Sequence, residues 1–224
     1  MMTKINPLLA VLNLLLVLAV PPFLLLTNLY PLMSSAFLRY EYGKADFPPA
    51  RGFTAEERLR VAEKAVLYLR SDADISLLGD LVDERGPLFN ERELAHMVDV
   101  KVLTQRAFSA HAFLGVLIGA SVTILLARRE TKRGVPSGLL AGSLLTIALL
   151  ILLIAVAYFN FDWFFVRFHR LFFEGDTWIF AHSDTLIRLF PPRFWFDATQ
   201  ALCILTLTEA ALLGAVSYWW GRRI

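Results

Sequence analysis

Hydrophobic residues form four long, nearly uncharged runs along the chain, and polar residues gather between them. The runs cover residues of about 8–29, 108–127, 135–159 and 198–220. A helix of about 20 apolar residues crosses a hydrocarbon layer roughly 30 Å thick, and in lipid it satisfies its own backbone hydrogen bonds. The pattern therefore predicts an all-α membrane protein, with four transmembrane helices in a single membrane domain over residues 1–224.

Basic residues follow an alternating pattern that predicts the topology. One side of the threaded chain collects Lys4, Arg128, Arg129, Lys132, Arg133, Arg222 and Arg223. The positive-inside rule makes this side cytoplasmic. Segments 30–107 and 160–197 are then extracytoplasmic, although the second also holds Arg167, Arg170, Arg188 and Arg193, which run against the rule.

A cleaved signal peptide is the alternative for the first hydrophobic run. Ser34 and Ala36 offer small residues ahead of a cleavage point. The run is longer than the about 7 to 15 apolar residues of a signal core, which favours a retained span. Both alternatives give the same orientation.

Composition excludes several classes of function. The net charge of +2 over 224 residues is too small to indicate binding to nucleic acid. Cys203 is the only cysteine, so the chain has no internal disulfide and no C-x-x-C pair. Membrane thiol oxidoreductases are thereby excluded.

The first outer segment contains helical patterns. Thr54 followed by Glu57 forms a capping box, and apolar residues then recur at helical spacing as far as Arg70. Residues 72–81 are rich in acids and indicate a loop or a short turn. We therefore expect an amphipathic helix in front of a polar connection.

A second capping pattern predicts another helix, which starts after Asn90 with Glu93 at its third position and carries His96. If this helix ran straight into the second span, His96 would stand roughly 16 to 18 Å above the start of the span at 1.5 Å per residue. An imidazole at that height would not reach lipid esters. The apolar content of residues 94–103 instead favours a helix that tilts or breaks near Gln105 and lies along the headgroup layer.

Phenylalanine and tryptophan dominate residues 160–197, which predicts an aromatic hairpin at the membrane interface. Tryptophan is enriched where lipid meets water, and so many phenylalanines need apolar surroundings, which the outer leaflet supplies. The alternative is an ordinary aromatic belt that only sets the depth of the helices.

The four histidines are candidates for acid–base chemistry, because an imidazole titrates near pH 6.5. His96 and His169 lie in the two outer segments, His111 near the outer end of the second span, and His182 in the hairpin. Asp99 follows His96 by three residues on the same helix, so it is placed to orient the ring, and the equal alternative is a solvated surface acid. The alternative for each histidine is a hydrogen-bonded structural role.

Glu209 lies near the middle of the fourth span, where an ionisable side chain is costly and indicates a function by default. It is about 16 Å along the helix from the outer end, too deep to join His96 and His169. We expect a protonated acid that is hydrogen-bonded to a neighbouring helix.

Familiar catalytic motifs are absent from the sequence. It contains no H-E-x-x-H zinc motif, no G-x-S-x-G elbow, no phosphate-binding P-loop and no G-x-G-x-x-G fingerprint. Neither a metal nor a cofactor is indicated. If the chain is an enzyme, its substrate is expected to supply the nucleophile.

Several stretches of the two outer segments resemble the lipoprotein intramolecular transacylase family of bacterial integral membrane proteins. They read GFT and ERL within 52–59, YL at 68–69, ELAHMVDVK at 93–101, FHRLFF at 168–173, DTW at 176–178 and DTLI at 184–187. The resemblance implies an enzyme of the bacterial cell membrane, with its active site on the extracytoplasmic face. Its partners would be a diacylated lipoprotein substrate and membrane lipids.

The resemblance also implies the reaction and its residues. An acyl chain moves from the sn-2 ester of a diacylglyceryl cysteine to the α-amino group of the same cysteine, which gives a lyso-form lipoprotein. His96 and His169 correspond to the catalytic pair of the family. His111 and His182 have no such correspondence.

Roles within the pair follow from their neighbours in the sequence. We expect His96 to be the base, supported by Asp99, and His169 to be the acid or the oxyanion donor, although the roles can be exchanged. The expected supporting or substrate-binding residues are Asp99, Arg167, Arg170, Phe172, Phe173, Trp178 and Asp184. The aromatic residues would contact the acyl chains, and the arginines would lie near the lipid headgroups.

Two other functions stay open at this point. The chain is alternatively a haem-binding membrane electron carrier with His111 as an axial ligand, which needs a second histidine, His182, at similar depth. It is otherwise a non-catalytic scaffold or sensor, whose outer segments bind a partner.

Overall fold

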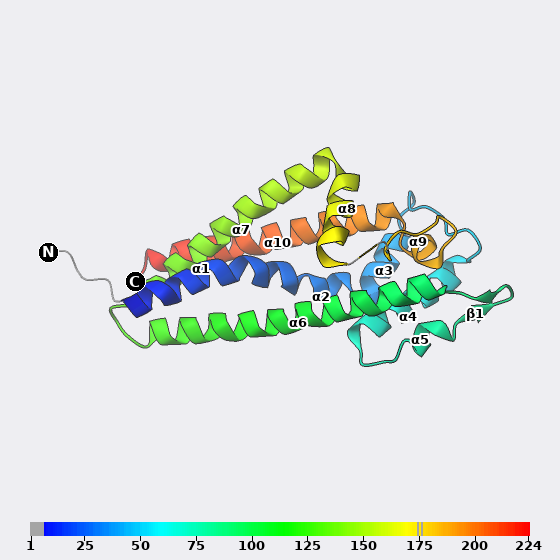
Figure 1. The fold of residues 1–224 in the computed structure, drawn as a ribbon. Helices are drawn as coiled ribbons and strands as arrows, with labels where there is room; N and C mark the ends of the chain where they lie inside the picture. The colour runs from blue at the N-terminus through cyan, green and yellow to red at the C-terminus, as the bar shows by residue number, and fades with distance from the viewer. Residues whose placement is uncertain (1–6, 174, 176) are drawn as a thin grey trace. The chain divides into compact units, whose positions relative to one another are not determined.

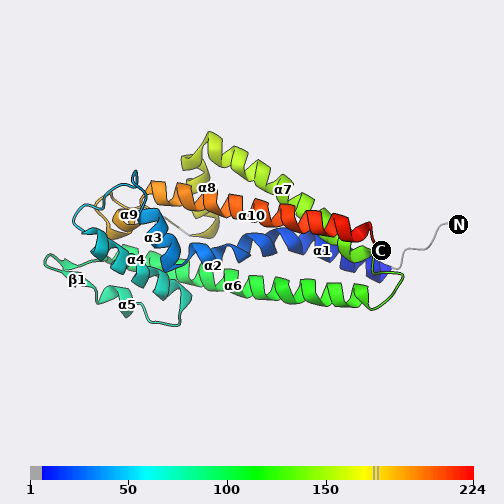
Figure 2. The same ribbon diagram turned by 180° about the vertical axis from the view of Figure 1, so that it is seen from behind.

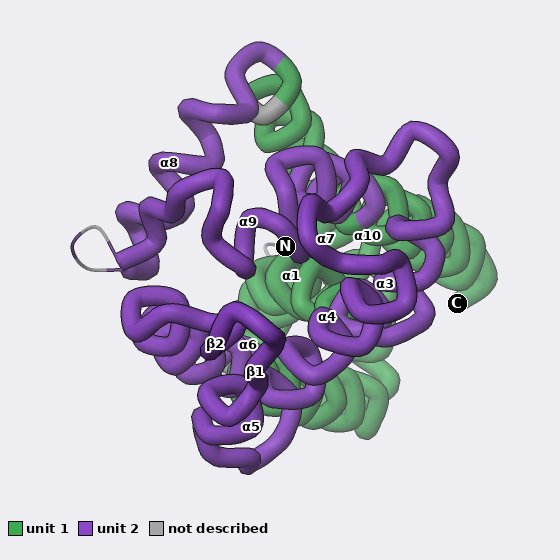
Figure 3. The backbone as a smooth tube through the Cα atoms, turned by 90° about the vertical axis from the view of Figure 1, so that its right-hand side faces the viewer, with its two compact units in different colours: residues 1–29, 108–158, 202–224 green, residues 30–107, 159–201 purple. Residues whose placement is uncertain are grey.

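The computed structural model describes residues 7–173, 175 and 177–224, which fold into ten α-helices and one short pair of strands. Lys4 and Asp176, used above, lie outside the described residues. The chain divides into two compact units, which Figure 3 distinguishes by colour. Unit 1 comprises residues 1–29, 108–158 and 202–224, and unit 2 comprises residues 30–107 and 159–201.

Four helices are long and apolar enough to cross a membrane, as the sequence predicts. They are α1 (Pro7–Thr27), α6 (Glu91–Leu126), α7 (Gly134–Phe159) and α10 (Pro192–Gly221), which Figures 1 and 2 show from opposite sides. The last helix begins at Pro192, earlier than the expected start near residue 198. A proline at the first helical position is favourable, because its missing N–H would have no partner there.

Small residues let the helices of unit 1 approach each other closely. A Cβ atom on Gly142 of α7 would lie 2.8 Å from the Cβ of Val20 on α1, and one on Gly138 would lie 3.3 Å from Leu16. Leu16 and Val20 are themselves buried. Glycine thus replaces a side chain that would hold α1 and α7 apart, as is common between helices in membranes.

Glu209 bonds to a neighbouring helical segment, as expected. The Nδ2 of Asn28, at the turn between α1 and α2 (Leu29–Leu32), lies 2.8 Å from the Oε2 of Glu209 and 3.1 Å from the hydroxyl of Thr206. The same amide lies 3.1 Å from the carbonyl of Leu24. The polar groups of this helix break therefore satisfy one another inside the apolar unit.

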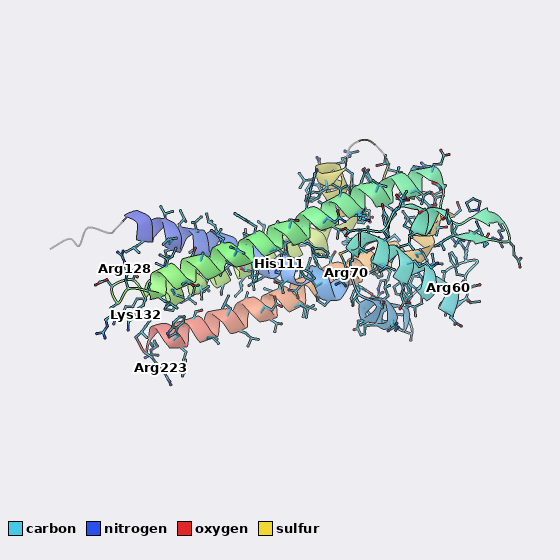
Figure 4. The ribbon with its side chains drawn as sticks, turned by 90° about the horizontal axis from the view of Figure 1, so that it is seen from below. Arg60, Arg70, His111, Arg128, Lys132 and Arg223 are labelled. Carbon is cyan, nitrogen blue, oxygen red and sulfur yellow. The ribbon has the colours of Figure 1, made fainter. Side chains whose placement is uncertain are left out.

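Basic residues gather at one end of unit 1. Figure 4 shows Arg128, Lys132 and Arg223 near one another, and the guanidinium of Arg133 donates to the carbonyl of Ile224. This clustering is what the positive-inside rule requires of one membrane face.

Unit 2 has its own hydrophobic core. It contains α3 (Ser35–Tyr42), α4 (Ala55–Arg70), α5 (Ser76–Gly79), the strands β1 (Val82–Asp83) and β2 (Gly86–Pro87), α8 (Phe161–Phe172) and α9 (Thr185–Leu189). Leu38, Leu78 and Leu189 are fully buried at its centre. Burial of each such side chain contributes about 1.5 to 3 kcal/mol.

Both predicted capping boxes are present. Thr54 and Glu57 exchange hydrogen bonds in front of α4. In front of α6, the N–H of Asn90 donates to Glu93 Oε2 over 2.9 Å, and the N–H of Glu93 donates to the side chain of Asn90 over 3.0 Å. Local sequence fixes these helix starts, because the bonding groups are three residues apart.

Of the two alternatives expected near Gln105, the break is wrong, because α6 is one continuous helix from Glu91 to Leu126. A tilt of the whole helix, which would bring His96 toward lipid esters, stays a prediction. Residues 91–107 of this helix belong to unit 2, and its residues 108–126 belong to unit 1. No proline or glycine interrupts the helix between residues 91 and 114, so nothing in the local sequence forces a kink.

The aromatic segment is more ordered than a simple hairpin, because it contains the two helices α8 and α9. Asn160 caps α8 by accepting a hydrogen bond from the N–H of Trp163 over 2.9 Å. The sequence pattern does not indicate α8, since a nearly continuous run of aromatic residues hides its helical period. Phe165, His169 and Phe173 nevertheless recur at intervals of four.

Arg58 binds the C-terminal end of α9 within unit 2. Its buried guanidinium donates to the carbonyls of Pro48 and Leu189 over 2.7 and 3.1 Å. The hydroxyl of Tyr42 donates to the same Leu189 carbonyl over 2.9 Å. These bonds satisfy the C-terminal end of α9, where a positive group is favourable.

We expect Gly142→Ala to destabilise the protein by about 1 to 3 kcal/mol, because the new methyl group would overlap the backbone-anchored Cβ of Val20. Gly119→Ala is the matched control, since a Cβ there meets nothing within 4 Å and alanine favours a helix. Thermal unfolding in detergent measures both variants. Equal melting temperatures would contradict the close approach of α1 and α7.

Candidate active site

The structure brings His96 and His169 together within unit 2. Their ring centroids lie 6.3 Å apart, and the two ring planes differ by 25°. One ring comes from the second turn of α6 and the other from the last turn of α8. Two imidazoles that are distant in sequence thus share one site.

Local helix geometry points each ring inward. On α6, Glu93, His96 and Met97 are buried while their neighbours Arg92 and Val98 are exposed, as expected of one helix face. On α8, His169 shares a face with the ring of Phe165, at a centroid distance of 4.0 Å. Each helix therefore sets the direction of its histidine through its own period.

Aromatic rings enclose both imidazoles. Phe173 lies 4.9 Å from the ring of His96 and 5.6 Å from that of His169, measured between centroids. Phe180 lies 5.3 Å from His96, and Trp178 lies 5.0 Å from His169. The two titratable groups thus lie within a cluster of aromatic rings, which we call the aromatic chamber.

A hydrogen bond fixes the tautomer of His169. Its Nδ1 lies 2.8 Å from the carbonyl oxygen of Phe165. A carbonyl only accepts, so Nδ1 carries the hydrogen. In the neutral ring, the Nε2 atom of His169 then holds a free lone pair.

His96 lacks a comparable bond. The side chain is 8% exposed, and its buried Nδ1 has no hydrogen-bond partner among the described residues. A buried polar atom without a partner is uncommon and is often found at functional sites. In the described chain, this atom is the only buried ring nitrogen of the histidine pair that lacks a hydrogen-bond partner.

Burial favours neutral imidazoles. It lowers the pKa of His169 below its ordinary value of 6.5, while the bond to the Phe165 carbonyl raises the pKa and offsets part of that effect. Two imidazolium ions at this ring separation would also repel each other. At neutral pH the pair is therefore uncharged.

The expected support of His96 by Asp99 is wrong. Asp99 is exposed, and the Nδ1 of His96 has no partner in the described structure. The packing of unit 2 turns the face with Glu93 and His96 inward, which leaves Asp99 on the solvent side of α6.

Of the other predicted residues, the structure places Trp178 directly beside a histidine, as described above, with its indole N–H donating to the carbonyl of Gly175 over 3.2 Å. Asp184 does not contact either imidazole. One of its carboxylate oxygens accepts from the N–H of Ala181 over 2.8 Å, and the other from the side chain of Asn90 over 3.3 Å. Asp184 therefore stabilises the loop in front of α9.

Arg167 and Arg170 are exposed on α8, away from the face that carries His169. The guanidinium carbon of Arg167 lies 5.4 Å from the ring centroid of Trp163. Leu171 and Phe172 are also exposed, the leucine by 75%. The outer surface of α8 thus combines basic and apolar side chains.

Sequence reasoning missed the contributions of Phe180 and the Phe165 carbonyl, and it gave Glu93 only a capping role. Helical spacing signals Phe165, which lies four residues before His169. No local signal identifies Phe180, because only the path of the loop brings it to His96.

The other two histidines lie elsewhere. His182 is exposed, whereas the Nε2 of His111 lies 2.9 Å from the hydroxyl of Thr27, and its ring stacks on Phe23 at 4.6 Å. Groups of three or more His, Cys, Asp or Glu side chains suited to a metal ion do not occur within residues 7–173, 175 and 177–224.

Comparison with known proteins identifies the family. Residues 12–195 match the family model described as lipoprotein intramolecular transacylase Lit. The chain belongs to the lipoprotein intramolecular transacylase family. A related protein of Aquifex aeolicus (strain VF5), described as uncharacterized, is 32% identical over 182 residues, which are 80% of this chain and 81% of that protein. The resemblance seen in the sequence is thereby confirmed.

The fold agrees with solved structures of the lipoprotein intramolecular transacylase Lit from Bacillus cereus, a membrane-integral protein. One of them matches with a TM-score of 0.81 and 23% identity over 96% of each chain. A variant of that protein with a histidine replaced by arginine matches with a TM-score of 0.73 and 21% identity, over 96% of this chain and 93% of that one.

Membership of the family gives the chain its class. It is a multi-pass membrane protein and an acyltransferase, a lipoprotein intramolecular transacylase that acts on lipoprotein substrates. The electron-carrier and scaffold alternatives are therefore set aside.

The lowered pKa of His169 predicts that the folded protein loses stability in acid. Its pKa is lowered by folding, so the unfolded chain binds more protons below about pH 6.5. The stabilising contribution is complete above that pH and is lost as the pH falls toward the lowered folded-state pKa. We expect the melting temperature in detergent to drop between pH 7.5 and pH 5.5, and to drop less in His169→Gln than in His182→Gln. An equal drop in both variants would contradict this origin.

Proposed function

We propose that the chain moves the acyl chain from the sn-2 ester of a diacylglyceryl cysteine to the α-amino group of that cysteine, with His169 and His96 as the acid–base pair. One observation carries the proposal: the two imidazoles meet in an aromatic chamber with complementary hydrogen-bonding states. One ring presents a lone pair, and the other has a buried nitrogen with no partner.

The reaction suits a site that mainly orients its substrate. The amine and the ester belong to one molecule, and holding reacting groups in an attack geometry can be worth about 7 to 11 kcal/mol. The substrate supplies the nucleophile, in keeping with the missing serine and metal motifs of the sequence.

His169 acts as the general base. Its Nδ1–H is bound to the Phe165 carbonyl, so its Nε2 is free to remove a proton from the amine during attack on the ester carbonyl. The free amine has a pKa of about 7.7 to 8.0, so it is largely neutral near pH 8, and the base has only to take the more acidic proton that the nitrogen carries once it has attacked the ester.

His96 donates to the developing oxyanion. A buried N–H without a partner is rarer than a buried acceptor without one, so the unpartnered Nδ1 is the nitrogen without hydrogen. The Nε2–H of His96 is then the donor. This assignment reverses the roles expected from the sequence, where Asp99 favoured His96 as the base.

The bonds and protons balance without a further reactant. A C–N bond forms between the α-amino nitrogen and the acyl carbon, and the C–O bond to the glycerol oxygen breaks. The proton taken by His169 Nε2 passes to that leaving oxygen. The products are an amide and a free hydroxyl group, which together are the lyso-form lipoprotein.

The aromatic chamber supplies a place for acyl chains. Phe173 and Trp178 flank the imidazoles, and exposed Phe172 and Leu171 continue the apolar surface along α8. Arg167 and Arg170, on the same helix, are suited to lipid phosphates at the interface. The positive-inside pattern supports an extracytoplasmic position for this site, in the cell membrane of a bacterium.

His96→Ala and His169→Ala should each insert into the membrane and lower the formation of lyso-form lipoprotein by about 10²- to 10⁴-fold, the usual contribution of acid–base groups. Mass spectrometry of a reporter lipoprotein, in cells without another route, measures the product. His182→Ala is the control, because this histidine is exposed and outside the site. Product formed by both site variants at the control level would overturn the proposal.

The rate of transfer should rise with pH and level off near about pH 8, where the substrate amine becomes neutral. Neither imidazole has to be a cation when the reaction starts, since burial lowers the pKa of His169, which gains its proton only from the attacking amine, and the donor role of His96 needs only a neutral N–H. We therefore expect no fall on the alkaline side up to about pH 9. Single-turnover rates in detergent test this, and a bell-shaped profile with a maximum near pH 6 would instead require an imidazolium acid.

A further inference from the structure

The segment after α8 closes over both imidazoles. We call its described residues 173, 175 and 177–184 the aromatic strap. It carries Phe173 and Phe180 against His96, and Phe173 and Trp178 against His169. The position of the strap therefore sets the enclosure of both rings.

The near end of the strap is fixed by α8 itself. The N–H of Phe173 donates to the carbonyl of His169 over 2.8 Å, which ends the helix at the catalytic ring. The far end has no such continuity with α8. It needs an anchor on another element to keep Phe180 against His96.

The first turn of α6 and the residues just before it supply that anchor. The bonds are Asn90 Nδ2 to Asp184, Arg92 Nη1 to the Ile179 carbonyl, Thr185 Oγ1 to the Leu88 carbonyl, and Leu186 N–H to Glu93. His96 lies on the next turn of the same helix. The same stretch of chain thus carries His96 and also anchors the far end of the aromatic strap.

Glu93 is the central member of this anchor. It is 1% exposed, and both oxygens of its carboxylate are used. Oε1 accepts the N–H of Leu186 over 2.6 Å, and Oε2 accepts the N–H of Asn90 over 2.9 Å. Asp184 makes no side-chain cap bond to α9, so the carboxylate of Glu93 takes over the capping of that helix.

We propose that Glu93 is a positioning residue for the histidine pair, which holds the aromatic strap so that the imidazoles of α6 and α8 stay in register. The inference rests on the proposed roles of His96 and His169. Glu93 acts through its bonds to Leu186 and Asn90, and Asn90 in turn holds Asp184 at the end of the strap. Its loss would misplace the reacting groups, and a shift of about 1 Å can cost on the order of 100-fold in rate.

The test compares Glu93→Gln with Glu57→Gln. Glutamine keeps one acceptor oxygen but replaces the other with a donor, which leaves one of the two backbone N–H groups without a partner. Glu57 has the matched capping role on α4, where it binds Thr54, and it makes no recorded bond to the strap in the described chain. A general effect of a lost capping box would appear equally in both variants.

Transfer rates per folded molecule are measured with a reporter lipoprotein. We expect a fall of about 10- to 100-fold for Glu93→Gln, and less than about twofold for Glu57→Gln. Equal rates in the two variants would overturn the inference. Loss of activity in His96→Ala and His169→Ala, with no difference between the glutamine variants, would refute the role of Glu93 and leave the proposed function standing.

Fluorescence measures the position of the strap relative to His169 independently of enzymatic activity. In a chain with Trp163, Trp195, Trp219 and Trp220 replaced by phenylalanine, Trp178 is the only indole. A protonated imidazole in contact with an indole quenches its fluorescence, so acid should quench Trp178 through His169. We expect Glu93→Gln to weaken this quenching and Glu57→Gln to keep it. Unchanged quenching in both would also overturn the inference.

Asp184→Asn covers the case in which Glu93→Gln does not fold. Asp184 is only partly buried, and the asparagine still accepts one of the two hydrogen bonds. The same direction is expected with a smaller loss of rate, about threefold to tenfold. Full retention of both the rate and the quenching in this variant would contradict an anchored strap.

Discussion

The hydrogen bond from His169 Nδ1 to the carbonyl of Phe165 is the interaction on which the proposed chemistry of this site depends. It joins residues four apart on α8, so the helix that presents the ring also selects its tautomer. A neutral imidazole held in this way has one nitrogen committed and one free. Without that bond, neither tautomer of His169 would be selected. The nitrogen that accepts the proton would then no longer be determined.

The aromatic chamber and the neutrality of the pair have the same physical origin. Rings of Phe173, Trp178 and Phe180 pack against the imidazoles, and burial among such apolar groups disfavours the charged forms of the imidazoles. A charged pair would be a poor base for an amine. The surroundings that we propose for the acyl chains would therefore also keep the histidines neutral for proton transfer.

The first two turns of α6 illustrate how a local motif acquires a tertiary role. The Asn90 and Glu93 capping box forms from residues three apart, as in α4, yet its glutamate carboxylate is shared with Leu186 on the distant α9 segment. In α4 the equivalent Glu57 stays exposed and binds only Thr54 among the described residues. The two motifs are alike in sequence, and only their surroundings distinguish them.

The sequence by itself determined the four spans, the two capping boxes and the two histidines worth testing, because hydrophobic length, cap spacing and the resemblance to a family are properties of short stretches. Tertiary structure alone decided that His96 faces Phe180 rather than Asp99, and that α6 continues without a break. Asp99 and Glu93 are each three residues from His96, so spacing could not choose between them. The orientation of α6 about its axis decides which acid is buried. Because Glu93 and Met97 face the interior of unit 2, Asp99 faces solvent.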